Sequence, residues 1–269
     1  MPKAPAQPRS ATARPTATGV PSTARARRDR AGRWSDPVTM GSDRAGAADP
    51  RSFDRFAAGY DRYVSLEPAG LPRWLLDHLP TRRGRALDAG CGSGRHTLAL
   101  ADRFDEVVGV DLSRPLIDIA RRRRGHPRVR YLAGDLLGFI DPDGFDLVLS
   151  ASALHHLDDL DAALRHLRGL VAPGGAVVLV DNVAQRPTPP RWVYLAGAVR
   201  DLPGDLRRHG WRQAAWRLRF RTGAPFLGHL ASDRYLTRQG FEERYGAAFP
   251  GARFQGLGQT HALIWRDPR

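Results

Sequence analysis

Three turns in the sequence carry residue types that could hold a nucleoside ligand. The first, Leu87-Asp88-Ala89-Gly90-Cys91-Gly92-Ser93-Gly94, has glycines at alternate positions, which allow positive φ and a close approach of the backbone to a ligand. Asp111 lies 21 residues beyond Gly90, and its carboxylate could accept charge-assisted hydrogen bonds from both hydroxyls of a ribose. Asp135 begins the third turn, where a carboxylate could accept from an exocyclic amino group such as that of adenine. Together the three turns predict a nucleoside-binding site.

The spacing of the glycines separates two kinds of nucleotide site. A dinucleotide-binding G-x-G-x-x-G turn needs glycine at position 95, and this position is Arg95. Gly90, Gly92 and Gly94 form G-x-G-x-G instead, so the pattern disfavours a cradle for a pyrophosphate. Each acid taken singly has a second interpretation, because aspartate is also a favoured helix N-cap. The occurrence of all three turns in one chain favours the ligand-binding interpretation.

The turns follow segments that alternate between strand and helix patterns. From Arg85 onward, short apolar runs alternate with helical periodicity, which predicts βαβ units around a parallel sheet. The predicted strands are Arg85–Asp88, Glu106–Val110, Val129–Ala133, Phe145–Leu149 and Ala176–Val180. The predicted helices are Gly94–Arg103, Ser113–Arg124 and Asp158–Val171, the last of them ended by Ala172-Pro173-Gly174-Gly175. The ligand crevice of a doubly wound sheet lies at the carboxyl ends of its strands, so the three turns are expected to meet there.

Length and composition exclude several classes of protein. The 269 residues suffice for one sizeable α/β domain with additions. Cys91 is the single cysteine, so no disulfide can form within the chain and we expect a reducing, cytoplasmic location. No apolar run approaches the roughly 20 residues that a membrane-spanning helix needs. The net charge is +14, and Lys3 is the only lysine among 42 basic residues, so codon usage competes with function as the source of this charge.

Residues 1–50 contain hardly any large apolar side chains, so we expect a disordered basic tail. The basic stretch Arg25-Ala26-Arg27-Arg28 is not followed by the apolar segment of an export signal, which disfavours export. Translation from Met40 is an alternative, because Met40 directly precedes the first sequence with domain character. The intact mass of the native protein would distinguish the two starts.

With these turns in view, the sequence resembles the class I S-adenosylmethionine-dependent methyltransferases, in particular the small-molecule, type 11-like group. The segments Phe53–Asp61, Ala153-Leu154-His155-His156-Leu157 and Leu170–Gly175 are also typical of that group. The resemblance implies methyl transfer from S-adenosylmethionine to a small-molecule acceptor. It also implies an α/β, Rossmann-like, doubly wound sheet of order 3-2-1-4-5-7-6 with an antiparallel last strand. A helix over Ser232–Phe249 and a hairpin of Ala252–Gly258 and Thr260–Arg266 would complete that sheet.

The resemblance assigns roles to individual residues. The turn from Asp88 to Gly94 would hold the amino acid part of the cofactor, Asp111 the ribose and Asp135 the adenine. His155, with His156 beside it, is the candidate general base, and the competing interpretation is that the pair only packs against the following helix. The cofactor-binding set predicted in this way is Tyr60, Asp88, Gly90, Gly92, Gly94, Asp111, Leu112, Asp135, Leu136 and Ser150.

The residues after two other strands bear on metals and acceptors. Asp181-Asn182 resembles the magnesium-binding pair of catechol-type O-methyltransferases, but the position of their third ligand is Ser150, so we expect no metal. The run Ser150-Ala151-Ser152-Ala153 lacks the Asp/Asn-Pro-Pro-aromatic turn of the methylases that act on amino groups of bases and glutamine. That class of acceptor is therefore disfavoured.

The segment between the fifth strand and the terminal helix leaves the acceptor open. Residues 186–221 hold nine arginines and two aspartates, interleaved with Trp192, Tyr194, Trp211, Trp216 and Phe220. We favour a lid over a small, lipid-like or anionic acceptor; a surface resting on anionic lipid, an RNA-binding platform and a plain solvated face are the alternatives. Nucleic acid is disfavoured because no appended binding module is visible. A cofactor-binding module without catalysis also stays open.

The sequence predicts four parts and does not indicate an oligomeric state. They are a tail (1–50), a cofactor-binding core (51–184), a helical basic and aromatic lid insertion (185–231) and a C-terminal helix with a hairpin (232–269).

Overall fold

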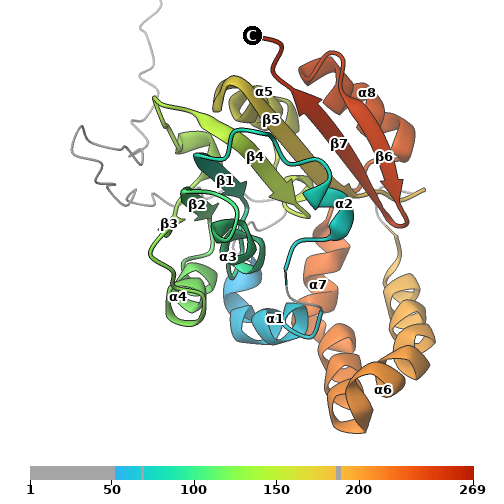
Figure 1. The fold of residues 1–269 in the computed structure, drawn as a ribbon. Helices are drawn as coiled ribbons and strands as arrows, with labels where there is room; N and C mark the ends of the chain where they lie inside the picture. The colour runs from blue at the N-terminus through green and yellow to red at the C-terminus, as the bar shows by residue number, and fades with distance from the viewer. Residues whose placement is uncertain (1–51, 68–69, 186–188) are drawn as a thin grey trace, which may run out of the picture.

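The computed structural model describes residues 52–67, 70–185 and 189–269 (Figure 1). The expectations for the tail, including Arg25–Arg28 and Met40, lie outside the described residues. Within the described part of the chain, no helix is long and apolar enough to cross a membrane.

A seven-stranded sheet of order β3-β2-β1-β4-β5-β7-β6 forms the centre of the molecule. Strands β1 to β5 run parallel, and β7 pairs antiparallel with both β5 and β6. The predicted fold class and strand order are therefore confirmed. The central strands are buried on both faces, as their continuous apolar runs indicate. The strands are β1 (Arg85–Ala89), β2 (Glu106–Asp111), β3 (Val129–Ala133), β4 (Phe145–Ala151), β5 (Val171–Asn182), β6 (Arg253–Leu257) and β7 (Thr260–Arg266).

Helices cover both faces of this sheet and extend beyond one end of it (Figure 1). The 3₁₀ turns are η1 (Ser52–Arg55), η2 (Leu136–Gly138) and η3 (Leu154–His156). The α-helices are α1 (Ala57–Val64), α2 (Arg73–Leu76), α3 (Arg95–Ala101), α4 (Arg114–Arg123), α5 (Leu160–Gly169), α6 (Arg191–Thr222), α7 (Ala224–Ser232) and α8 (Arg238–Ala248).

Strand β5 begins earlier than the sequence predicts. Val171 pairs with Phe145 of β4, so it belongs to the strand and not to the end of the preceding helix. The Pro-Gly-Gly run then forms an irregularity inside the strand, where the register against β4 shifts. A Cβ atom on Gly175 would lie 2.8 Å from two backbone oxygens, which explains why glycine is needed there. The run therefore shapes β5, and the prediction that it ends the preceding helix is wrong, because α5 already ends at Gly169.

The prediction of one helix over Ser232–Phe249 is wrong. Helix α7 ends at Ser232, the chain is extended at Asp233, and α8 begins only at Arg238. The Thr237 hydroxyl accepts a hydrogen bond from the Gly240 amide at 3.0 Å and caps α8, which gives the helix a start that its periodicity does not reveal. The break places Asp233 and Tyr235 in the interior of the protein.

Helix α6 consists of two arms that meet at a kink. The kink is at Gly210, whose φ of 75° lies outside the helical region. A buried ion pair between Asp205 and Arg217 (3.1 Å) and a second between Asp201 and Arg221 (3.0 Å) join the two arms. Figure 1 shows the kinked end pointing away from the sheet.

Charged groups hold the N-terminal segment at the carboxyl ends of the strands. Asp61 in α1 is fully buried and accepts from Arg123 and Arg124 at 2.6 Å each. Arg124 also donates to the Ser93 carbonyl in the glycine turn at 2.9 Å, so α1, α4 and the turn share one arginine. This arrangement holds Tyr60 over the carboxyl ends of the strands.

Candidate active site

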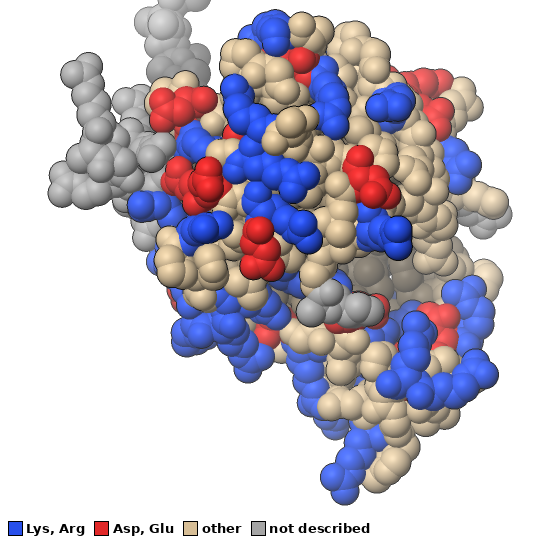
Figure 2. Space-filling view, in the orientation of Figure 1, with Lys and Arg blue, Asp and Glu red and all other residues tan. Residues whose placement is uncertain are grey.

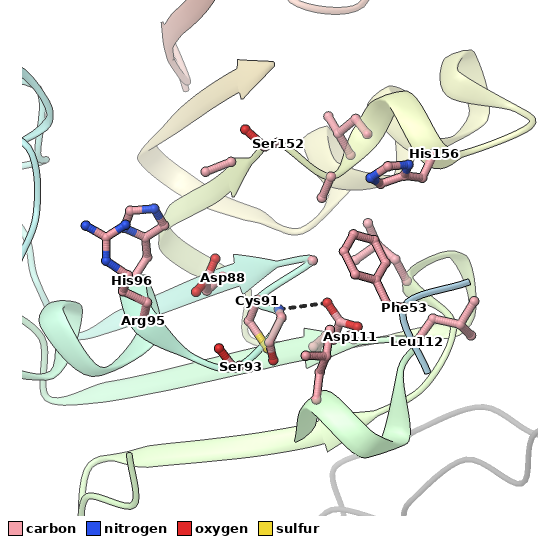
Figure 3. Close-up of a pocket in the computed structure, with 18 of the residues that line it drawn as sticks. Phe53, Asp88, Cys91, Ser93, Arg95, His96, Asp111, Leu112, Ser152 and His156 are labelled. Atoms are coloured by element: carbon pink, nitrogen blue, oxygen red, sulfur yellow. Dashed lines mark hydrogen bonds between the residues drawn. The ribbon is translucent and has the colours of Figure 1, made fainter. Parts of the chain in front are cut away.

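A cavity of about 280 Å³ opens at the carboxyl ends of β1, β2 and β4 (Figure 3). Most of the predicted cofactor residues line it; Gly94 and Ser150 do not, and neither does the candidate base His155. The predicted residues that line the cavity are Tyr60, Asp88, Gly90, Gly92, Asp111, Leu112, Asp135 and Leu136.

The glycine turn combines positive φ with crowding. Gly90 has a φ of 77°, and a Cβ atom there would lie 2.3 Å from the Cβ of Ala153. Gly94 has a φ of 86°, and its Cβ would lie 2.5 Å from the hydroxyl oxygen of Tyr131. Gly94 therefore serves packing beneath the turn, whereas Gly92, with nothing closer than 3.9 Å, leaves space on the cavity side.

Asp111 connects the second strand to the glycine turn. One carboxylate oxygen accepts from the Gly92 amide at 2.7 Å and the other from the Ser113 amide at 2.9 Å; the first bond is the dashed line in Figure 3. Burial raises the pKa of Asp111, although these two amides favour its ionised form. Each carboxylate oxygen has a further acceptor position, so the side chain can still bind two hydroxyl groups.

Asp88 is nearly inaccessible, and the Thr97 hydroxyl donates to it at 2.6 Å. Burial raises the pKa of Asp88 to about 7, and the neighbouring Asp111 carboxylate adds to the increase. A cationic group in the cavity would favour the ionised form of Asp88. The protonation state of Asp88 near neutral pH therefore depends on whether a cationic ligand is bound.

Asp135 and Ser150 have local structural bonds. The Asp135 carboxylate accepts from the Leu137 amide at 3.0 Å and caps η2, while its exposed side chain also borders the cavity. Asp135 therefore caps a helical turn and lines the cavity at the same time. Ser150 is fully buried and donates to the Ala89 carbonyl at 2.8 Å, so it joins β4 to β1 below the cavity.

Among the other side chains that line the cavity are Phe53, Arg95 and His96 (Figure 3), to which the sequence analysis gave no role in the site. Burial and Arg95 lower the pKa of His96 to about 4, so this imidazole is neutral. Burial and the Asp111 carboxylate raise the pKa of Tyr60 to about 12. Arg95 was visible in the sequence only as the residue that breaks the dinucleotide pattern, and its position directly after Gly94 was the signal for a cavity-facing cation.

The two histidines after β4 differ in position. His156 lines the cavity, whereas His155 contacts Asp181 and also faces Asp233. Although burial opposes the charged form, the two carboxylates hold the pKa of His155 above its usual value. The hypothesis that His155 is a general base stays a prediction, and the geometry gives its side chain no direct place at the cavity.

The insertion contacts the N-terminal segment that borders the cavity through α7 and through Phe220 of α6. No described residue of 189–231 lines the cavity. Instead, His229 packs on Phe53 with ring centroids 4.2 Å apart, and Phe226 packs on Phe56 at 5.8 Å. The insertion therefore supports the cavity wall from behind.

Comparison with known proteins agrees with this architecture. A methyltransferase-domain family model matches residues 86–175. An uncharacterized methyltransferase of Mycobacterium tuberculosis is 41% identical over 111 residues, which are 40% of this chain and 56% of that protein. The demethylmenaquinone methyltransferase of Thermus thermophilus is 35% identical over 197 residues, or 68% of this chain and 78% of that protein.

Two solved structures share the fold. The DhpI–SAH complex superimposes with a TM-score of 0.55 and 21% identity over 84% of this chain and 100% of that chain. Phosphoethanolamine N-methyltransferase 2 of Haemonchus contortus, in complex with S-adenosyl-L-methionine, has a TM-score of 0.54 and 20% identity over 82% and 48%. Together with the sheet order and the sequence relatives, they identify the chain as a member of the class I S-adenosylmethionine-dependent methyltransferases.

Proposed function

We propose that this chain transfers a methyl group from S-adenosylmethionine to a small-molecule acceptor. The observation that carries the proposal is the position of Asp88 and Asp111 on either side of one glycine turn, in one cavity. The whole chain's activity is proposed on this basis together with its family.

The residues present fit the cofactor part by part. Asp111 would accept from the ribose hydroxyls, and Asp135 with Leu136 would border the adenine. Asp88 would face the α-ammonium group and Arg95 the carboxylate of the amino acid part. The space left at Gly92, where a Cβ would meet nothing closer than 3.9 Å, suits the close approach of this ligand.

The chain would act mainly by orientation. The bound cofactor supplies an electrophilic methyl group whose sulfonium charge is lost on transfer. Holding two reactants in line is worth on the order of 7–11 kcal/mol. An acceptor that attacks as an anion or through a neutral nitrogen would need no general base during the transfer itself. Phe53, Leu154 and Leu157 give the remaining cavity wall an apolar character, which would desolvate the acceptor.

The proposal is tested by binding and turnover together. Calorimetric titration with S-adenosylhomocysteine should show one site. Label transfer from methyl-labelled S-adenosylmethionine should then be measured across a panel of acceptors. Demethylmenaquinone, trans-aconitate and phosphoethanolamine are included because related or similar proteins are named for them. Binding without transfer to any acceptor would favour a cofactor-binding module, and absence of binding would contradict the proposal.

Helix α6 supports a second function, peripheral contact with an anionic membrane. Trp192, Val199 and Trp211 are 66%, 60% and 69% exposed, although large apolar side chains are normally covered. Exposed arginines accompany them at positions 191, 200, 207, 208 and 212, and Figure 2 shows basic atoms over the α6 region. An apolar and basic helix of this kind binds anionic lipid interfaces, which would bring a lipid-like acceptor to the enzyme.

Vesicle sedimentation tests this second function. The chain should sediment with phosphatidylglycerol-containing vesicles and not with pure phosphatidylcholine vesicles, and the double variant Trp192→Ser/Trp211→Ser should lose this binding. A chain that sediments equally with both, or with neither, would contradict membrane contact. Salt-sensitive retention of RNA in a filter assay would instead assign the arginines to nucleic acid.

A further inference from the structure

A buried cluster of three histidines and one aspartate lies behind the cavity wall. His155 and His156 come from η3, His229 from α7 and Asp233 from the segment after α7. Their side chains are 6%, 17%, 5% and 1% exposed. Four potential ligand side chains thus meet in one place, two from η3 and two from the end of α7 and the residue that follows it.

The imidazoles converge on the Asp233 carboxylate. His156 Nδ1 lies 3.1 Å from Asp233 Oδ1, His155 Nε2 lies 3.8 Å from Oδ2, and His229 Nε2 lies 3.9 Å from Oδ1. One nitrogen from each of His155 and His156 and one oxygen of Asp233 all lie within 4.8 Å of one another. The two longer separations exceed hydrogen-bond distance, so hydrogen bonds to Asp233 do not account for the whole convergence.

In His155 and His229, the ring nitrogen that points away from Asp233 contacts another oxygen atom. His155 Nδ1 contacts a carboxylate oxygen of Asp181, whose other oxygen accepts from the Tyr245 hydroxyl at 3.3 Å. His229 Nδ1 lies 2.8 Å from the Ser52 hydroxyl oxygen. A histidine that binds a metal typically donates its second nitrogen to a carboxylate or another oxygen, which fixes the ring. Both rings have this arrangement, with Nε2 turned toward Asp233.

Asp233 provides a separate indication. Its Oδ2 accepts from the Tyr235 hydroxyl at 2.7 Å, whereas the nearest polar groups to its buried Oδ1 are imidazole nitrogens, His156 Nδ1 at 3.1 Å and His229 Nε2 at 3.9 Å. A buried carboxylate is costly unless positive charge compensates it, and around Asp233 Oδ1 that charge would come from a protonated imidazole or from a metal ion bound between the imidazoles and the carboxylate.

We propose that His155, His156 and Asp233 bind a divalent transition-metal ion of the zinc class, with His229 within reach as a further ligand. Imidazole nitrogen with one carboxylate is a donor set that suits zinc and its neighbours better than magnesium or calcium. Ligand atoms of a tetrahedral zinc site lie about 3.3 Å apart, given bonds of about 2.0–2.1 Å. His156 Nδ1 and Asp233 Oδ1, 3.1 Å apart, are already near this spacing, and the ligand atoms of the whole set, which lie within 4.8 Å of one another, would move closer together around the ion.

This site differs from the catechol-type magnesium site that the sequence disfavoured. The catechol-type site would use Asp181, Asn182 and the position of Ser150, whereas here Asp181 supports a ligand and is not one itself. The ligands lie 78 residues apart in the sequence, between His155 and Asp233, and therefore show no motif spacing. Only the fold brings them together.

A metal here would have two consequences for the chain. It would link the end of α7 to η3, the turn that follows β4. The insertion would thereby be held against the cavity wall. The metal would also engage the second nitrogen of His155, since Asp181 holds the first, so a metal-bound His155 could not act as a general base. Because His156 lines the cavity, the cavity provides a path by which the ion can enter.

Metal titration of the untagged full chain tests the proposal. After chelation and dialysis, ZnCl₂ should bind at one equivalent per chain, and Co²⁺ should give the visible absorption of a low-symmetry site with nitrogen ligands. Asp233→Asn and His156→Gln should each weaken zinc binding at least 100-fold, and Asp181→Asn about 10–100-fold through its loss as a supporting group. His126→Gln, which changes a histidine outside the cluster, should bind zinc as the unaltered chain does.

Two results would overturn the proposal: less than stoichiometric binding by the unaltered chain, or equal binding by Asp233→Asn, His156→Gln and the unaltered chain. Titration with S-adenosylhomocysteine and circular dichroism show whether each variant is folded. If the cluster variants do not fold, the Co²⁺ spectrum of the unaltered chain decides, because a spectrum of purely hydrated Co²⁺ would refute the site. These readouts do not depend on methyl transfer, so they can fail while the proposed function stands.

Discussion

At the scale of single residues, the two carboxylates beside the glycine turn have different environments. Asp111 keeps two backbone amides as partners, whereas Asp88 has the Thr97 hydroxyl. The sequence predicted both acids from their place after strands. It could not predict that Ser150 faces the interior or that His96 faces the cavity, since alternation along a strand end and the turn of a short helix decide those directions.

Asp111→Ala should weaken binding of S-adenosylhomocysteine about 10- to 150-fold, because hydrogen bonds to a charged group are worth about 1.5–3 kcal/mol. Calorimetry measures the change, with Asp118→Ala, which alters an acid paired with Arg121 on α4, as the control. Equal affinity of Asp111→Ala and the unaltered chain would show that the ribose lies elsewhere.

Cofactor affinity should rise as the pH increases from 6 to 8. The pKa of Asp88 in the ligand-free protein is about 7, and only its ionised form would attract the ammonium group of the ligand. Asp88→Asn should bind more weakly and lack this dependence. A titration series at constant ionic strength measures both, and a pH dependence that survives in Asp88→Asn would assign it to another group.

The same carboxyl should affect stability in the opposite direction. Its folded-state pKa of about 7 lies above the value of about 3.9 expected in the unfolded chain. Its contribution to stability is therefore complete below about pH 4 and is lost as the pH rises through 7. Without ligand, the melting temperature of Asp88→Asn minus that of the unaltered chain should increase as the pH rises from 5 to 8. A constant difference would contradict the raised pKa.

At the scale of elements, the parallel strands were predictable, whereas the kink within α6 and the break between α7 and α8 were not. Strands β1 to β4 begin where their apolar runs begin, because burial on both faces leaves little choice of residue. Helix α8 starts six residues later than predicted, because the capping hydroxyl of Thr237 and the buried Asp233 override a helical pattern. The kink at Gly210 likewise depends on ion pairs between arms that the sequence does not show as neighbours.

Asp61→Ala should release α1 from α4 and lower stability by about 3 kcal/mol, because it removes the buried partner of two arginines. Thermal unfolding measures the loss, and cofactor affinity should fall with it since Tyr60 lies on the same helix. Asp161→Ala, which removes an exposed pairing with Arg244, should change little. Equal melting temperatures for the two variants would show that the contacts of Asp61 with Arg123 and Arg124 do not stabilise the packing of α1 on α4.

At the scale of the whole molecule, the sheet presents three strand ends to one cavity, the N-terminal segment borders it, and α7 packs behind that segment. This division explains why the turns could be predicted from sequence while the acceptor could not. The turns are local, whereas the acceptor wall combines Phe53, Leu154 and His156, which are supported by residues from more distant segments.

A crystal structure of the full chain with S-adenosylhomocysteine tests the central claim most directly. The account predicts the ribose hydroxyls within hydrogen-bond distance of the Asp111 carboxylate, the amino acid part beside Asp88, and the sulfur facing the loop after β4. A ligand bound outside this cavity, or one whose ribose does not touch Asp111, would contradict it.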